Sequence, residues 1–241
     1  MSTKLLYLEN MWDLEADAHV MRVEKQDGRD VVYLDQTILY AQGGGQPYDT
    51  GVIKNDHVKF IVEEVRFVDG EVLHFGNFDD DSFKRDEAVH IIVDADRRKL
   101  HARLHSAGHV VDMAVSQLCP DWIPGKGYHF PDSPYVEYDG QIDFEKRDEL
   151  IADIAKLGNE FIKQAMPVSF KFVNYDELKK LCRHIPENIP TNKPTRVVIF
   201  DNFAVPCGGT HVKNLAELEE LTITKIKNKD GKIRVGYNVS R

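Results

Sequence analysis

The sequence has few cysteines and no long apolar run. Cysteine occurs three times in 241 residues, at Cys119, Cys182 and Cys207. An odd and sparse set argues against a disulfide scaffold and is typical of a reducing compartment, so we expect a cytoplasmic protein. No stretch approaches the ~18–20 apolar residues of a membrane span, so we expect no membrane partner. Glu9 interrupts the N-terminal segment before the apolar region of a signal peptide can form.

Positive charge is in the minority, because 31 Lys and Arg residues face 40 Asp and Glu residues and the net charge is −9. A protein that binds a phosphate backbone usually has a basic balance, or at least a basic stripe. Two local stretches are nevertheless basic, and local patches decide docking more than the sum does. One holds Arg97, Arg98 and Lys99, and the other holds Lys225 and Lys227. Each stretch is either a contact for nucleic acid or a solvated charged face.

The composition that remains supports a folded core. Hydrophobic residues make up 42% of the chain, and charged residues of both signs make up 29%. Residues 5–93 form short alternating runs separated by turns, which is typical of a small closed barrel. Beyond them, strands and helices alternate without strict βαβ order. The sequence therefore predicts an α+β protein, with a small β-barrel-like domain over residues 1–90 and an α+β domain over residues 91–241.

The second domain is predicted to open with a long helix over residues 97–118. Asp94 or Asp96 can cap this helix, and apolar side chains recur along it at helical spacing. Residues 125–130 are predicted to be a glycine-rich loop. The other predicted elements are a strand at 135–138, a hairpin presenting residues 141–144, helices at 146–165 and 175–182, strands at 168–173 and 196–200, and a closing hairpin of 221–227 with 232–237.

Three consecutive glycines, Gly43, Gly44 and Gly45, interrupt the first domain. Glycines cost backbone entropy on folding, so a run of them indicates either a close approach of the backbone to a ligand or a wide turn. The run is not a phosphate loop, because no Gly-Lys-Ser/Thr sequence follows it. Gln46 comes directly after the run and offers both a donor and an acceptor.

Two segments each place potential metal ligands four positions apart. His105 and His109 lie on one face of the predicted helix, and Cys207 and His211 repeat the spacing. A histidine pair alone is more often a surface or core pair, but the second segment favours one shared Zn²⁺ in a tetrahedral site. The pattern is not the zincin motif, because Ser106 stands where that motif needs a glutamate.

A third histidine, His101, lies one helical turn before His105 in the same column. Spacing alone allows it to be a ligand. We leave it outside the predicted set, because four better candidates already fill a tetrahedron.

Three motifs together resemble the freestanding alanyl-tRNA editing proteins, the AlaX group, and the editing domain shared by alanyl- and threonyl-tRNA synthetases. They are residues 39–51, residues 96–109 and residues 207–212, in the family's order. The glycine-containing first domain resembles the longer class of these proteins, and the chain leaves no room for an aminoacylation domain. The resemblance implies a translation-fidelity enzyme that hydrolyses the ester joining serine or glycine to alanine tRNA. It also implies that His105, His109, Cys207 and His211 hold the zinc ion.

The residue that reads the serine hydroxyl is left open by the resemblance. Some family members use a threonine in the loop after the zinc helix, but here that loop is Gly125-Lys126-Gly127 and has no hydroxyl. A site that hydrogen-bonds a hydroxyl can reject the analogue lacking it by as much as ~10⁴–10⁵. Gln46 and Thr37 are the candidates for this role, beside Gly43, Gly44 and Gly45 as substrate-adjacent backbone.

Other functions remain open at this point. The zinc ion can activate a water molecule, or it can only order the site and the substrate. A zinc-dependent hydrolase of small esters and a non-catalytic tRNA-binding module with a structural zinc are alternatives, and threonine tRNA editing is a rival within the family. A tRNA partner would have to meet the two basic stretches. The oligomeric state is not indicated.

Overall fold

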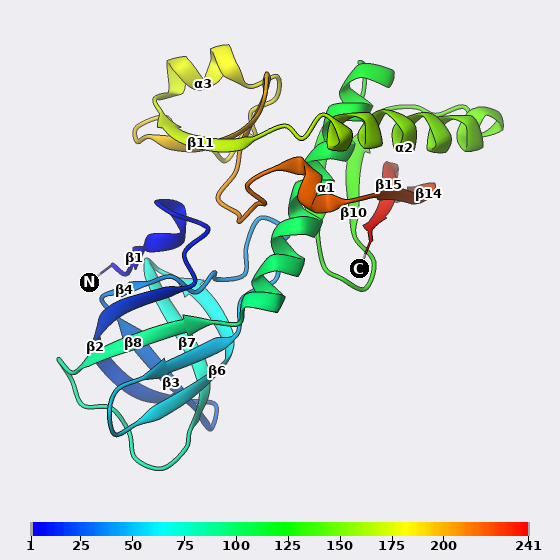
Figure 1. Cartoon of the computed structure of the whole chain (residues 1–241). Coiled ribbons are helices and arrows are strands. Elements are labelled where there is room, and N and C mark those ends of the chain that lie inside the picture. Colours follow the sequence, from blue (N-terminus) through cyan, green and yellow to red (C-terminus); the bar gives the residue numbers. More distant parts are fainter. Residues whose placement is uncertain (1, 241) are drawn as a thin grey trace. The chain divides into compact units, whose positions relative to one another are not determined.

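The computed structural model describes residues 2–240, and Figure 1 labels its elements. The chain divides into two compact units, Met1–Leu100 and His101–Arg241. Helix α1 (Ala95–Leu118) begins in the first unit and continues through the division into the second. The division at residue 90 stays a sequence-based prediction.

The first unit is built on a closed six-stranded barrel, as predicted. Neighbouring strands follow the order β2-β3-β7-β6-β5-β8 around the barrel, and all pairs are antiparallel. The strands are β2 (Glu15–Gln26), β3 (Arg29–Leu34), β5 (Gly51–Lys54), β6 (Lys59–Val68), β7 (Glu71–Phe78) and β8 (Ala88–Val93). Short strands β1 (Lys4–Leu5) and β4 (Gln36–Thr37) pair in parallel, and the 3-10 helix η1 (Leu6–Leu8) follows β1.

Tight turns and alternating side chains explain why this part of the chain closes. Asp27 and Gly28 both have positive φ, +51° and +81°, which is the geometry of a two-residue hairpin turn between β2 and β3. Alternate side chains of the strands point inward, and Val32, Phe60 and Ile91 are fully buried in one apolar cluster. This hairpin is one of the turns that the sequence predicts between the short alternating runs of residues 5–93.

The second unit combines helices with two antiparallel sheets, which confirms the α+β prediction. One sheet has the strand order β14-β15-β10-β9, and the other has the order β11-β12-β13. The strands are β9 (Ile123–Tyr128), β10 (Tyr135–Asp139), β11 (Val168–Val173), β12 (Thr195–Phe200), β13 (Phe203–Pro206), β14 (Leu221–Lys229) and β15 (Lys232–Val239). The helices after α1 are η2 (Phe144–Lys146), α2 (Arg147–Lys163), α3 (Tyr175–Leu181) and η3 (Leu215–Leu218).

Three details of the second unit differ from the sequence-based prediction. The predicted loop at residues 125–130 largely belongs to β9, because its backbone pairs with β10 although its glycines give no apolar alternation. The predicted hairpin around residues 141–144 is replaced by η2, which Asp143 caps by accepting from the backbone N–H of Glu145. Strand β13 was not predicted.

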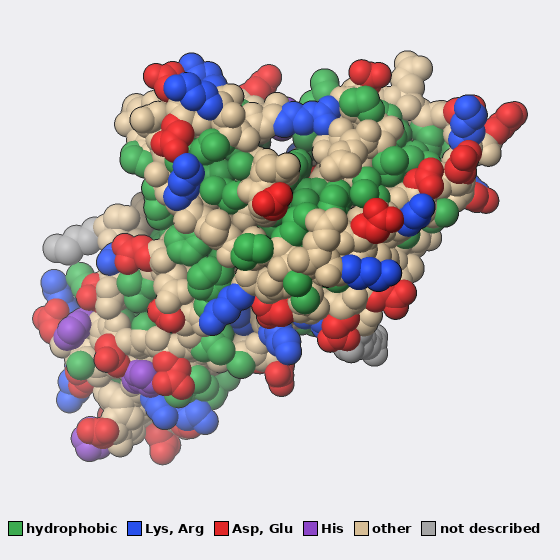
Figure 2. Space-filling view, turned by 45° about the horizontal axis from the view of Figure 1, so that its top comes forward, with side chains coloured by type: hydrophobic (Ala, Val, Ile, Leu, Met, Phe, Trp, Pro, Cys, Tyr) green, Lys and Arg blue, Asp and Glu red, His purple; other side chains and the backbone are tan. Residues whose placement is uncertain are grey.

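The exposed charges of the molecule are mixed in sign. Figure 2 shows Lys and Arg side chains interspersed with Asp and Glu on the face in view. Across residues 2–240, no helix is both long and apolar enough to cross a membrane.

Candidate metal centre

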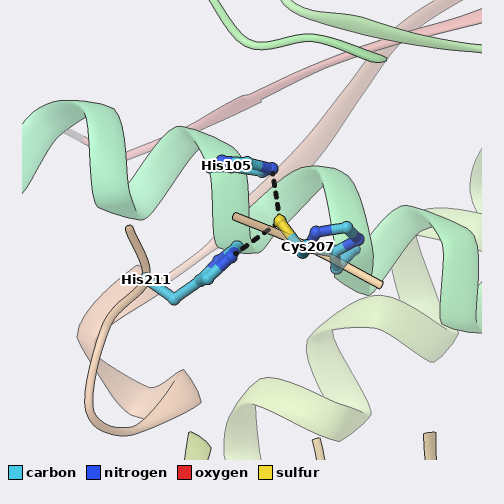
Figure 3. Close-up of side chains that lie close together, drawn as sticks. His105, Cys207 and His211 are labelled. Atoms are coloured by element: carbon cyan, nitrogen blue, oxygen red, sulfur yellow. Dashed lines mark hydrogen bonds between the residues drawn. The ribbon is translucent and has the colours of Figure 1, made fainter. Parts of the chain in front are cut away.

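The four predicted ligands come together in the second unit. His105 and His109 come from α1, whereas Cys207 and His211 come from the loop that follows β13. Their ligand atoms all lie within 4.8 Å of one another. The Cys207 sulfur lies 3.5 Å from Nε2 of His105 and 3.4 Å from Nε2 of His211 (Figure 3). His101 is not part of this group.

The loop that carries Cys207 is held by its own backbone and by one arginine. The Cys207 N–H donates to the carbonyl of Arg196 on β12 at 3.1 Å. The Arg196 guanidinium, which is buried, donates in return to the carbonyls of Cys207 and Gly209 at 2.8 and 3.0 Å. Sequence reasoning did not identify this role of Arg196, because a basic residue in a strand gives no sign that it is buried.

Polar side chains hold the outward nitrogens of two imidazoles. Nδ1 of His109 lies 3.4 Å from a carboxylate oxygen of Asp112, whose other oxygen accepts from the Tyr138 hydroxyl at 2.6 Å. Nδ1 of His211 lies 3.2 Å from the Ser106 hydroxyl, which also accepts from the backbone N–H of residue 212. These contacts fix the rings so that each Nε2 is left for the centre of the group.

Burial and neighbouring charges set the protonation of the group. Burial, with the other histidines, holds the pKa of His105 and of His211 well below its ordinary value. Burial alone would also lower the pKa of His109, but the Asp112 carboxylate and the Cys207 sulfur raise it to about 9. Burial tends to raise the pKa of Cys207, yet His109, the Gly209 N–H and Arg196 bring it below its usual value. The thiolate and the neutral imidazole are the forms that bind a metal, and the shifts of Cys207, His105 and His211 are in the direction of those forms.

A fourth imidazole, that of the buried His129, packs against the group. Its ring stacks on that of His105 with centroids 4.3 Å apart and an angle of 20° between the planes. The Tyr237 hydroxyl donates to the carbonyl of Leu104 at 3.0 Å, so it accepts from Nδ1 of His129 at 2.6 Å. Burial and the nearby His109 lower the pKa of His129 to about 3, so its ring is neutral.

Two glycines make room for the His129 ring. A Cβ added at Gly108 would lie 2.5 Å from the imidazole, and one added at Gly127 would lie 2.3 Å from it. Sequence reasoning missed His129 because a single histidine after a glycine-rich stretch carries no spacing signal. Glycines on either side of the ring were the only sign of close packing, and their partner was not visible in sequence.

The other predicted substrate residues belong to the first unit. The Thr37 hydroxyl is buried and lies 2.9 Å from Nε2 of His74, and it accepts from the backbone N–H of Leu39. Gln46 is fully buried, and its backbone pairs with Gly43 across a tight turn. Gly44 and Gly45 form the centre of this turn with φ of +54° and +77°, so the triple glycine is a two-residue turn.

The predicted basic residues have different surroundings. Arg98 is buried, where its guanidinium contacts the Asp49 carboxylate and donates to the carbonyls of Met11 and Ile38. Its donors are therefore used inside the first unit. Arg97 is half-buried, and Nε donates to the carbonyl of Tyr48 at 3.0 Å. The side chains of Lys99, Lys225 and Lys227 are exposed.

Two family models match the chain. The model for class II (A) tRNA synthetases matches residues 7–97, and the model for the second additional domain of threonyl and alanyl tRNA synthetases matches residues 195–235. The second match includes Cys207 and His211. The chain thus has a barrel unit followed by an α+β unit that holds a group of three histidines and one cysteine. With the two matches, this architecture identifies a protein related to the threonyl and alanyl tRNA synthetases.

Several alanyl-tRNA editing proteins are similar in sequence to this chain. The alanyl-tRNA editing protein AlaX-M of Methanosarcina barkeri is 31% identical over 94% of this chain and 94% of its own length. AlaX-M of Saccharolobus solfataricus is 32% identical over 98% of this chain and 99% of its own length. AlaX-L of Pyrococcus horikoshii is 28% identical, and the chain spans 54% of its length. The chain belongs to the family of alanyl-tRNA editing proteins, which are aminoacyl-tRNA deacylases.

Proposed function

We propose that this chain hydrolyses, in trans, the ester that joins serine or glycine to alanine tRNA. The observation that carries the proposal is the buried group of three histidines and one cysteine in a member of this family. Its ligand atoms lie within 4.8 Å of one another, although the two segments are about a hundred residues apart in sequence. The reaction class follows from the family, and the choice of serine or glycine is part of the proposal.

The group fits one Zn²⁺ ion. Three imidazole nitrogens and one thiolate are a donor set that zinc takes in tetrahedral geometry. Nε2 of His109 is buried and has no hydrogen-bond partner among residues 2–240, as expected of a nitrogen that binds a cation. With all four side chains bound, the ion would have no open position. For a bound Zn²⁺ to polarise the ester carbonyl or lower the pKa of a water molecule, one ligand would have to be loose or the coordination would have to expand; otherwise the ion would order the site and the substrate.

The chain's own residues hold the site rigid and dry. Asp112 and Ser106 orient the imidazoles of His109 and His211, so little rearrangement is needed when a ligand enters. The stacked ring of His129 covers one face of His105, and Tyr237 fixes that ring. Both side chains keep water from that face.

Some of the substrate-recognition residues predicted from sequence are kept as part of the proposal. Gln46 stays the sequence-based candidate for reading the serine hydroxyl, with Gly43, Gly44 and Gly45 as its turn, and its side chain is fully buried in the structure. We do not retain Thr37, because its hydroxyl is already bonded to His74. For tRNA we retain Arg97, Lys99, Lys225 and Lys227, and not Arg98, whose guanidinium is used internally.

The test is deacylation of alanine tRNA charged with serine, glycine or alanine. We expect the wild-type protein to release serine or glycine and spare alanine, and Cys207→Ala to lose both bound zinc and activity. Cys119→Ser is the matched control, because Cys119 lies outside the ligand group, and it should retain zinc and activity. Zinc content is measured on the same samples.

Three outcomes would replace the proposal. A zinc-loaded protein that leaves all three esters intact would be a tRNA-binding module with a structural zinc. Equal cleavage of free serine esters and tRNA-linked ones would indicate a small-ester hydrolase. Preferential cleavage of mischarged threonine tRNA would indicate threonine tRNA editing instead.

A further inference from the structure

One face of the sheet β14-β15-β10-β9 carries an unusual set of side chains. Val136, Val235 and Ile226 pair in register across three strands and are buried, so they mark the inner face. The rows on either side of them face outward. One outer row runs across the four strands in register as Tyr128, Tyr135, Gly236 and Lys225.

Three aromatic rings stack on this outer face. Tyr128 lies between Phe130 and Tyr135, with ring centroids 4.4 and 5.2 Å away and an angle of 15° to each plane. The guanidinium carbon of Arg234 lies 4.4 Å from the centroid of the Tyr135 ring and closes that end of the stack. Phe130 forms the other end, because no further aromatic ring of the described chain packs on it. All three rings are partly exposed.

Positive charge borders the stack. Lys225, Lys227 and Lys229 alternate along β14 on the same face, and within residues 2–240 none of them has an ion-pair partner. The Lys225 side chain lies over Gly236, where an added Cβ would be 3.2 Å from its Cγ. Two acidic residues of this face are neutralised, since Glu137 pairs with Arg234 and Asp139 with Lys232, whereas Asp132 accepts from the Tyr128 hydroxyl at 3.5 Å.

The stack adjoins the metal centre through the chain itself. Tyr128 and Phe130 flank His129, whose imidazole stacks on the ligand His105 on the inner side. The aminoacyl ester of a charged tRNA sits on the ribose of the last nucleotide, so a surface that holds the last base must lie beside the site that cleaves the ester. Stacked aromatic side chains with bordering lysines are how proteins hold unpaired nucleotides.

We propose that the outer face formed by Phe130, Tyr128 and Tyr135, with Lys225 and Lys227, binds the unpaired 3′ end of the tRNA. The terminal base extends the aromatic stack at Phe130, and the lysines contact the phosphates that precede it. This inference rests on the proposed function for its substrate, but it assigns a binding surface that the metal centre alone does not specify.

The first experiment uses the wild-type protein and tRNA whose terminal adenine is replaced by 2-aminopurine. Stacking on an aromatic ring quenches the fluorescence of this base, so we expect quenching that saturates with protein concentration. Unchanged fluorescence at a protein concentration that saturates binding, measured by filter retention, would overturn the inference.

The second experiment measures the dissociation constant for uncharged tRNA with and without its last nucleotide. We expect Phe130→Leu to weaken binding of the intact tRNA about tenfold, within the range for one stacked base, and to leave binding of the shortened tRNA unchanged. Phe130→Tyr retains the ring and should bind like wild type. Equal binding of intact tRNA by Phe130→Leu and wild type would show that the stack only supports the hairpin.

The lysines are tested by salt dependence. Lys225→Gln with Lys227→Gln should weaken binding of both tRNAs and reduce the salt slope by about one per lysine. Lys156→Gln, an exposed lysine on α2, should change neither quantity. A slope that stays at the wild-type value in the double variant would overturn the assignment of these lysines.

Separate measurements of tRNA binding and of ester hydrolysis distinguish this inference from the proposed function. Cys207→Ala should lose deacylation yet still quench 2-aminopurine, because the stack does not use the metal ligands. Quenching without any deacylation by wild type would overturn the proposed reaction and retain the surface. Deacylation without quenching would retain the reaction and overturn the surface.

Discussion

Asp112 lies one helical turn after His109 and connects it to Tyr138 on another element. The carboxylate is 3.4 Å from Nδ1 of His109 and accepts from the Tyr138 hydroxyl at 2.6 Å. A carboxylate behind a histidine ligand fixes the ring and raises its basicity toward a metal. Asp112 is outside the group of four, yet it sets the orientation of the His109 ring.

We expect Asp112→Asn to weaken zinc binding about 10- to 100-fold, in the range found for such partners. An asparagine oxygen can accept from only one of the two groups at full strength, and the negative charge is lost. Tyr138→Phe should have a smaller effect in the same direction. The measurement is the zinc dissociation constant by competition with a chromophoric chelator.

Asp153→Asn is the control for this prediction, because Asp153 is exposed on α2 and outside the ligand group. It should leave the constant unchanged. If Asp112→Asn binds zinc as tightly as wild type, helix geometry alone orients His109 and Asp112 has no positioning role.

A single glycine allows strands β6 and β7 of the barrel to pair closely. Gly76 on β7 faces β6 so closely that an added Cβ would lie 1.8 Å from the carbonyl oxygen of Ile61. The obstacle is backbone, so it cannot move aside without disturbing the pairing of the two strands. A β-bulge in the register of β6 lies next to this point.

Gly76→Ala should destabilise the first unit by about 2–3 kcal/mol or more, at the upper end of the usual cost of overpacking. Urea unfolding followed by Trp12 fluorescence in a Trp122→Phe background reports this unit. Asn77→Ala, at the next position of the same strand and exposed, should change the free energy of unfolding much less. Similar unfolding midpoints for the two variants would contradict the packing argument.

The elements that could be predicted are those with a periodic apolar signal. The barrel strands and α1 carry such a signal, and the four-residue spacings of His105 with His109 and of Cys207 with His211 predicted the whole group. Strand β9 carries none, because Pro124 and Gly127 stand at two of its paired positions.

Residues whose role depends on burial were not predictable in the same way. Arg98 stands in a basic run, but its guanidinium is enclosed by groups from distant parts of the first unit. His129 has no sequence partner, and its stacking on His105 depends on how β9 lies on α1. Such contacts join residues that are far apart in the sequence, so they can be identified only in the folded chain.

The largest pH effect in the first unit comes from His74. Full burial lowers its pKa to about 4 from the ordinary value of 6.5. Nδ1 donates to the carbonyl of Val32, and Nε2 accepts from the Thr37 hydroxyl, so only the neutral ring fits. Between these pKa values the unfolded state binds the proton and the folded state does not.

Stability of the first unit should therefore be complete above pH 6.5 and should fall as the pH drops toward 4. The total loss from this group is on the order of 3 kcal/mol. Urea unfolding followed by Trp12 at several pH values measures it. His74→Leu should flatten the pH dependence, whereas His57→Gln, an exposed histidine of the same unit, should preserve it. An equally steep dependence in His74→Leu would assign the proton uptake elsewhere.

The two halves of the ligand group are made at different times during synthesis. α1 leaves the ribosome with His105 and His109, and about a hundred more residues must follow before Cys207 and His211 appear. A chain that stops short of residue 207 therefore carries two ligands of four. Because the four residues span that length, a chain that ends before residue 207 cannot assemble the group, and a complete group requires that translation has passed residue 211.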